Sequence, residues 1–210
     1  MTGLRPRGRR GVYTAAATAF TTSALALLAT AMTGPQPPPV PLPRVHTAPT
    51  AHSTAVQPQG AVLSRSEPVV LSIPRIGLRT EVDEVTRAAD GSVALPEDPD
   101  HAGWYTGSVT PGERGNAITV GHVDSEDGPA AFYDLGTLRR GFPLTVTRRD
   151  GSTARFTVTG IDVWAKNAFP SQRVYGPTTT ATLTLITCTG WDSTHHTYRS
   201  NLVITAELTP

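Results

Sequence analysis

From about residue 68 onward, short runs of β-branched and apolar residues alternate with clusters of turn residues. Such runs predict β-strands, and the hairpin signal is strongest around Arg149-Asp150-Gly151. Only Ala130–Leu138 carries apolar residues at helical spacing. The pattern predicts an all-β domain, a single closed or nearly closed β-barrel with one or two short helices. The expected strands are Val69–Ile73, Val93–Leu95, Ala117–Val120, Leu144–Arg148, Arg155–Trp164, Thr180–Thr187 and Asn201–Leu208.

The N-terminal residues 1–32 have a different pattern. Four arginines between positions 5 and 10 precede Val12–Met32, which is 21 residues without a charge. That length fits a membrane-spanning helix, and the basic flank predicts a cytoplasmic N-terminus with the rest of the chain outside the cell. Ala29-Thr30-Ala31 also fits a cleavage site, so a cleaved signal peptide is the alternative. We favour a retained single-pass anchor in the cell membrane.

Residues 33–67 follow as a segment rich in proline, serine, threonine and alanine. Such a composition buries too little apolar surface to fold and favours extended conformations. We therefore expect a disordered linker over residues 33–67 and one folded domain over residues 68–210. His46 and His52 lie in the linker without a metal-binding pattern around them.

Charge and composition limit the kinds of partner that this chain is expected to bind. The chain carries 18 Lys+Arg against 17 Asp+Glu, so it lacks the basic excess of a nucleic-acid-binding protein. The loop carboxylates Asp98, Asp100, Glu126 and Asp127 show no regular calcium-ligand spacing, and we expect a solvated acidic rim. No metal and no cofactor are therefore predicted.

Cys188 is the only cysteine in 210 residues, and it ends the predicted strand Thr180–Thr187. In an exported protein, a thiol without a partner in its own chain is either a buried structural residue or a reactive group. A reactive role needs a group that forms the thiolate and a group that stabilises an oxyanion.

Candidates for both groups exist. His122 follows a predicted strand and Gly121, which favours a position at a cleft, although a loop histidine bonded to Asp124 is the alternative. His101, His195 and His196 are weaker candidates. Arg199 directly precedes the predicted last strand, and antiparallel pairing with the Cys188 strand would bring its guanidinium beside the thiol. A solvated surface ion pair is the other interpretation of Arg199.

Together these residues resemble one family. Thr184-Leu185-Ile186-Thr187-Cys188 fits the TLxTC motif of sortases, and His122, Cys188 and Arg199 follow the sortase order. The segments 121–125, 128–133 and 196–201 look most like the actinobacterial class F sortases, with class E as the alternative. The resemblance covers essentially all of residues 68–210.

The resemblance implies a cysteine transpeptidase. Such an enzyme cuts a Leu-Pro-x-Thr-Gly sorting signal between Thr and Gly and joins the threonine carbonyl to an amine. Cys188 would be the nucleophile that forms a thioacyl intermediate, His122 the general acid and base, and Arg199 the oxyanion donor. Thr187 would either contact the substrate or pack within the strand. We expect a bell-shaped dependence of rate on pH.

The implied partners are surface proteins with a C-terminal sorting signal and an amine from a cell-wall precursor or a pilin. The enzyme would anchor such proteins to the cell wall. Two other classes stay open. One is a cysteine hydrolase or peptidoglycan transpeptidase with the same His and Cys. The other is a catalytically silent wall-binding scaffold in which Cys188 is structural.

Overall fold

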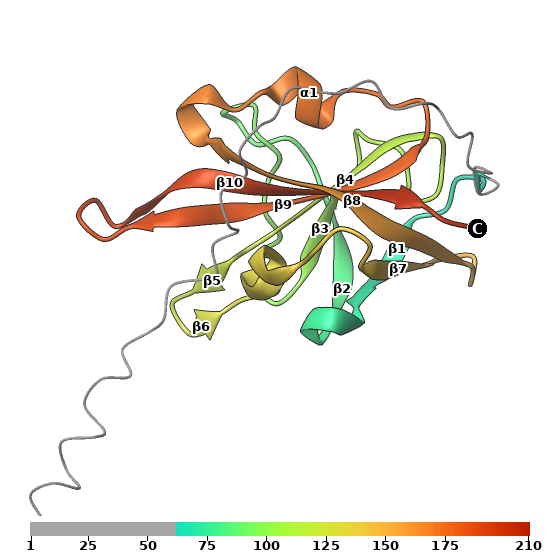
Figure 1. Ribbon diagram of the computed structural model, residues 1–210, viewed down its shortest axis with the longest axis horizontal. Helices are drawn as coiled ribbons and strands as arrows, with labels where there is room; N and C mark the ends of the chain where they lie inside the picture. The colour runs from blue at the N-terminus through green and yellow to red at the C-terminus, as the bar shows by residue number, and fades with distance from the viewer. Residues whose placement is uncertain (1–61) are drawn as a thin grey trace, which may run out of the picture. The chain divides into compact units, whose positions relative to one another are not determined.

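Eight strands close into one barrel in the computed structural model, which describes residues 62–210 (Figure 1). The predicted all-β barrel is confirmed. In barrel order the strands are β1 (Pro68–Ile73), β2 (Leu78–Val85), β3 (Ala102–Tyr105), β4 (Gly115–Gly121), β9 (Ala181–Asp192), β10 (Thr197–Leu208), β8 (Thr153–Ala165) and β7 (Pro143–Arg148).

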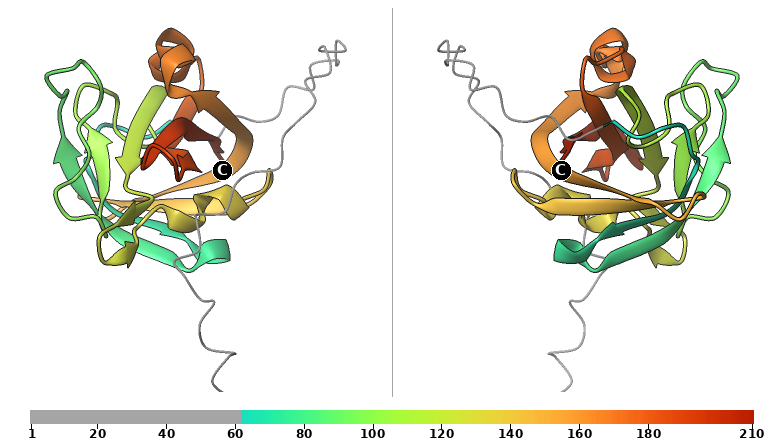
Figure 2. Two further views of the ribbon diagram at one scale, coloured as in Figure 1. Left: turned by 90° about the vertical axis from the view of Figure 1, so that its left-hand side faces the viewer. Right: turned by 90° about the vertical axis from the view of Figure 1, so that its right-hand side faces the viewer.

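Small elements lie outside the barrel wall. Strands β5 (Asp124–Ser125) and β6 (Gly128–Pro129) form a separate two-stranded sheet. Three 3₁₀ turns and one α-helix complete the described elements, and the views in Figure 2 show α1 outside the barrel. They are η1 (Pro74–Ile76), η2 (Tyr133–Thr137), η3 (Lys166–Ala168) and α1 (Ser171–Tyr175).

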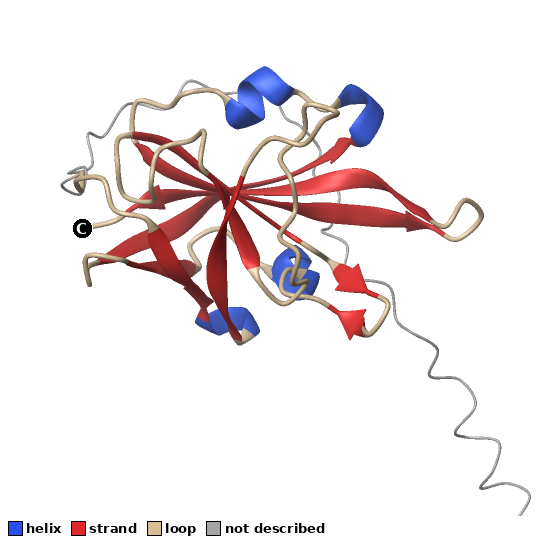
Figure 3. Ribbon diagram, turned by 180° about the vertical axis from the view of Figure 1, so that it is seen from behind, coloured by secondary structure: helices blue, strands red, loops and turns tan. Residues whose placement is uncertain are grey.

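Two of the barrel pairings are parallel, β2 with β3 and β4 with β9, whereas the others are antiparallel. Parallel neighbours run in the same direction, so residues near the ends of β4 and β9 lie at one edge of the barrel. The β9–β10 hairpin continues beyond that edge as a projecting ribbon (Figure 3). This edge is where the predicted site residues lie.

The barrel interior is filled by alternate residues of the strands. On β9, Leu183 and Leu185 are fully buried, and they join Ile204, Phe156 and their neighbours in one apolar core. The alternate residues of the same strands face outward and form a second apolar cluster beneath α1 that includes Ile118, Val120, Ile186 and Val203. Because side chains alternate along a strand, the position of a residue in its strand decides whether its side chain reaches the interior or the outer face.

Several local expectations need correction. Val93–Leu95 is not a strand, because only Val93 forms a bridge, to Arg87. Strands β2 and β3 were missed, since β2 carries acidic and basic residues that strands usually lack and β3 has only four residues. The helix expected over Ala130–Leu138 is the shorter turn η2, which contains Gly136. Helix α1 was not anticipated.

The described chain begins before β1. Residues 62–67, within the range assigned to the linker, run along the barrel, where Leu63 N donates to Gly112 O (2.9 Å) and Ser66 N donates to Thr110 Oγ1 (3.1 Å). The predicted anchor over residues 1–32 and the linker through residue 61 lie outside the described residues. No helix within residues 62–210 has the length and apolar character needed to cross a membrane.

Candidate active site

The register of β4 against β9 sets His122 beside Cys188. Val120 and Ile186 are paired, and both belong to the outer apolar cluster. Side chains alternate along strands, so the residues two positions further, His122 and Cys188, leave their strands on the same outer face. The two residues that the sequence analysis selected therefore leave paired strands on the same face at one edge of the barrel.

Thr187 lies directly before Cys188 on β9, and its side chain faces the barrel interior. Its side chain is buried, and Oγ1 donates a hydrogen bond to the carbonyl of Gly121 (2.8 Å). The bond ties the nucleophile strand to the residue directly before His122. In the free protein this is the contact that the Thr187 hydroxyl makes.

Gly121 is required at its position by close packing. A Cβ on Gly121 would lie 2.7 Å from the ring of Phe132, closer than such atoms approach. The Phe132 amide also donates to the His122 carbonyl (2.9 Å). Phe132 thus packs against the strand end and holds the backbone of the histidine. This explains the Gly-His pair by packing, not by backbone flexibility.

His122 is half-buried, and its Nε2 lies 3.1 Å from the carbonyl oxygen of Pro96 in the β2–β3 loop. A carbonyl can only accept a hydrogen bond, so this geometry assigns the proton to Nε2. Nδ1 is then the ring nitrogen left for proton exchange. The alternative in which His122 bonds to Asp124 is not what the structure has.

Cys188 is half-buried and opens into a cavity of about 500 Å³. On β10 its cross-strand partner is Asn201, which lines the same cavity. The other walls come from the β2–β3 loop and from the η3–α1 segment. The walls are mixed: polar and charged residues alternate with the apolar or aromatic side chains of Val93, Leu95, Val120, Phe169, Tyr175 and Ile186.

Arg199 lies within β10, not before it, and its guanidinium points into the projecting hairpin. It forms an ion pair with the Asp192 carboxylate and a hydrogen bond with His195 Nδ1 (3.0 Å). His195 Nδ1 also lies 2.8 Å from the Asp192 carboxylate. That hydrogen bond is the largest cause of the lowered pKa of Asp192, and the Arg199 contacts contribute less. The antiparallel β9–β10 pairing is as expected, but Arg199 does not line the cavity beside Cys188.

A cross-link between the hairpin and the histidine loop was missed by the sequence analysis. The Tyr198 hydroxyl donates to the Asp124 carboxylate, and the Tyr198 ring lies 5.0 Å from the ring of Trp191. Burial first and then the neighbouring Asp124 carboxylate raise the pKa of Tyr198. The two residues are 74 positions apart, and no local pattern marks the pair.

Asn116 on β4 was also missed. It is buried, and its Nδ2 donates to the carbonyls of Val174 (2.8 Å) and Gly176 (3.2 Å) at the end of α1. Its Oδ1 accepts from Thr184 Oγ1 (2.7 Å). The last carbonyls of a helix lack partners within the helix, so Asn116 satisfies two of them and fixes α1 over the cavity.

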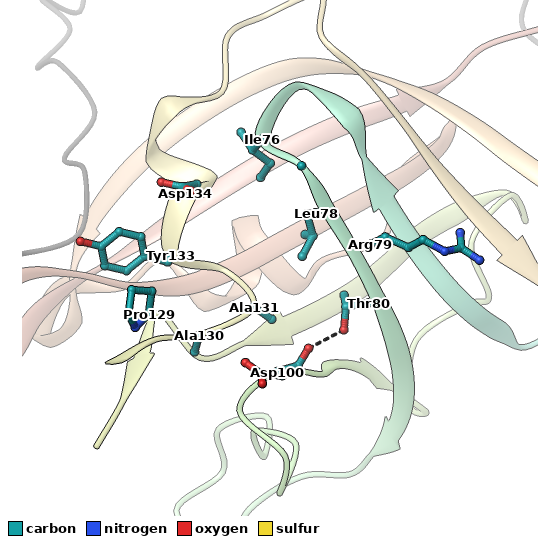
Figure 4. A pocket seen from close by; sticks show the side chains of 11 residues that line it. Ile76, Leu78, Arg79, Thr80, Asp100, Pro129, Ala130, Ala131, Tyr133 and Asp134 are labelled. Atoms are coloured by element: carbon teal, nitrogen blue, oxygen red, sulfur yellow. Dashed lines mark hydrogen bonds between the residues drawn. The ribbon is translucent and has the colours of Figure 1, made fainter. Parts of the chain in front are cut away.

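A second cavity of about 330 Å³ lies between η1, β2 and η2 (Figure 4). Arg79, Thr80, Asp100, Tyr133 and Asp134 are its polar side chains, and the thiol does not line it. Within residues 62–210, no three His, Cys, Asp or Glu side chains are grouped for a metal ion. Of the three selected residues Cys188, His122 and Arg199, only Cys188 lines the cavity of about 500 Å³.

Comparison with known proteins agrees with this geometry. A family model described as the sortase domain matches residues 71–209, more than half of the chain. The chain belongs to the sortase family. The match includes Cys188, His122 and Arg199 within one sortase domain. A comparison with curated proteins found no match.

Solved sortase structures share the fold. A lid mutant of sortase A from Corynebacterium diphtheriae has a TM-score of 0.53 and 21% identity, covering 70% of this chain and 73% of that chain. Sortase C1 from Streptococcus agalactiae has a TM-score of 0.53 and 20% identity, covering 68% and 67%. A sortase D5 transpeptidase from Clostridium perfringens has a TM-score of 0.52 and 19% identity, covering 69% and 79%. At these identities the likeness concerns the sortase barrel.

Proposed function

We propose that this sortase is a cysteine transpeptidase that cleaves a Leu-Pro-x-Thr-Gly-like sorting signal and transfers it to an amine. The observation that carries the proposal is the position of Cys188. The only thiol of the chain lines a cavity of about 500 Å³ at a barrel edge, on the outer face that it shares with His122. The apolar side chains among its mixed walls, such as Leu95, Phe169 and Ile186, suit the Leu-Pro part of such a signal.

In the first step, His122 accepts the thiol proton and Cys188 Sγ attacks the carbonyl carbon of the signal threonine. His122 then returns a proton to the departing glycine amine as the C–N bond breaks, which leaves a thioester on Cys188. Because Nε2 donates to Pro96 O, Nδ1 is the nitrogen that would exchange these protons.

In the second step, an incoming amine attacks the thioester carbonyl and gives its proton to His122, and the thiolate leaves. The oxyanion of each tetrahedral intermediate needs a hydrogen-bond donor. Arg199 lies on the same face of β10 as Asn201, the cross-strand partner of Cys188. It becomes this donor when its guanidinium leaves Asp192 and His195 and binds the substrate. Thr187 is a positioning residue in this scheme, because its hydroxyl proton is used by Gly121 O.

We assign the chain to class F on the segments 121–125, 128–133 and 196–201, with class E as the alternative. The proposed partners are surface proteins that bear a sorting signal and an amine from a wall precursor or a pilin. The proposed location is the outer side of the cell membrane, held by residues 1–32. Because the two classes differ mainly in the signal they prefer, kcat/KM for peptides that vary around Leu-Pro-x-Thr-Gly tests the class.

The activity test compares the wild-type protein with Cys188→Ala on a fluorogenic Leu-Pro-x-Thr-Gly peptide, with and without triglycine. Mass spectrometry identifies the products. A new amide that the variant cannot make supports transpeptidation through Cys188. Release of free acid alone, unchanged by the amine, would identify a hydrolase. No cleavage together with an unreactive thiol would favour the silent scaffold.

A further inference from the structure

Lys166 is the only lysine of the chain, and it lines the cavity that contains Cys188. It begins η3 directly after β8, whose Trp164 is paired with Asn201 on β10. Asn201 is in turn paired with Cys188 on β9. Neighbouring strands are about 4.8 Å apart, so the backbone near Lys166 lies about 10 Å from the nucleophile strand. The flexible side chain of lysine can shorten that gap.

The ammonium of Lys166 lacks a counter-charge. Lys166 is exposed, and it forms no ion pair or side-chain hydrogen bond with any residue between 62 and 210. The residue before it, Ala165, is paired with Ser200, which follows Arg199 on β10, but the Arg199 guanidinium is already paired with Asp192. An anion that enters the cavity beside Cys188 would therefore find Lys166 as its available partner.

The cavity has one other charged side chain, Asp90 in the β2–β3 loop. Its Oδ1 accepts from the Ser92 amide (2.9 Å) and the Ser92 hydroxyl (2.6 Å), and the hydroxyl bond is the larger cause of the lowered pKa of Asp90. This carboxylate is held within its own turn and is not paired with Lys166. The wall formed by the β2–β3 loop thus carries a carboxylate that is bonded within its own turn, and the wall formed by η3 carries the unpaired ammonium of Lys166.

We propose that Lys166 selects an acidic side chain at the variable position of the sorting signal, between proline and threonine. The inference rests on the proposed function, because it assumes that the signal threonine reaches Cys188. Consecutive Cα atoms are 3.8 Å apart, so the variable residue lies within one residue of the scissile carbonyl. A glutamate there can extend toward η3 and meet the lysine ammonium.

The test measures kcat/KM for three peptides that differ only at the variable position, which is Glu, Gln or Lys. For the wild type we expect the Glu peptide to exceed the Gln peptide about threefold to fivefold, as for a partly exposed ion pair, and the Lys peptide to be the poorest. Added salt should reduce the preference. Lys166→Met should bring the Glu/Gln ratio close to one, and Lys166→Glu should reverse the order of the Glu and Lys peptides.

Arg140 provides the matched control, because it is an exposed cation in the turn before β7 and does not line the cavity. Arg140→Met should keep the wild-type Glu/Gln ratio. Equal kcat/KM for Glu and Gln in the wild type, or a ratio that survives in Lys166→Met, overturns the role of Lys166 alone. If the wild type cleaves no peptide and Cys188→Ala binds none, the sorting-signal function is wrong and this inference falls with it.

Discussion

Two buried threonines on β9 provide a matched test of how the nucleophile strand is held. Thr187 and Thr189 face the same side of the strand and are 3% and 2% exposed. Thr187 Oγ1 donates to Gly121 O, whereas Thr189 Oγ1 is the one buried side-chain polar atom without a partner within residues 62–210. Valine at either position exchanges a hydroxyl for a methyl group and keeps the β-branched shape.

The expected changes in the free energy of unfolding have opposite signs. Thr187→Val removes a hydrogen bond and leaves a carbonyl short of a donor, so we expect a loss of about 1–2 kcal/mol. Thr189→Val removes a buried hydroxyl that has no partner, so we expect a gain of about 1 kcal/mol. For a domain of about 150 residues, each kcal/mol shifts Tm by roughly 2–4 °C, which separates the variants by about 4–12 °C.

Thermal and urea unfolding of the purified variants measure this difference, and Thr187→Ser, which keeps the hydroxyl, is the control for Thr187→Val. Because Gly121 precedes His122, Thr187→Val should also slow the reaction, whereas Thr189→Val should not. If both valine variants lose the same stability, the hydrogen-bond assignment on this strand is wrong.

Three other predictions follow from single contacts. Asn116→Leu should lower the free energy of unfolding by about 3 kcal/mol, since three hydrogen bonds are lost. It should also raise KM for the peptide more than it lowers kcat. An unchanged KM would show that α1 has no part in substrate binding. The hydrogen bond to Asp83 is the main cause that raises the pKa of His101 above 6.5. The stabilisation of the fold by protonated His101 is complete below pH 6.5 and is lost as pH rises through the raised pKa. Urea midpoints should therefore fall from pH 6 to 8 in the wild type and fall less in His101→Gln. Arg199→Lys should lower kcat about 10²-fold or more because it loses the planar fork, and activity close to wild type would exclude the oxyanion role.

The parts that sequence could predict are those with a local pattern. β9 is a continuous run of β-branched and apolar residues with the thiol near its end, so the strand and the place of the thiol along it could be predicted from one segment. β2 could not be recognised, because its charged residues point outward and only its position in the barrel makes it a strand. The ion pair of Arg199 with Asp192 could not be predicted for a similar reason, because Asp192 lies on the other strand of the hairpin.

The Thr184–Cys188 motif joins chemistry to architecture. Thr184 is buried and holds Asn116, which fixes the end of α1 over the cavity, and Thr187 is buried and holds Gly121 at the start of the histidine loop. The end of α1 and the start of the His122 loop are therefore both attached to the strand that carries the thiol. A displacement of this strand would move Cys188, the start of the His122 loop and the α1 side of the cavity together. The threonines of the motif are thus required by geometry, independently of any contact with the substrate.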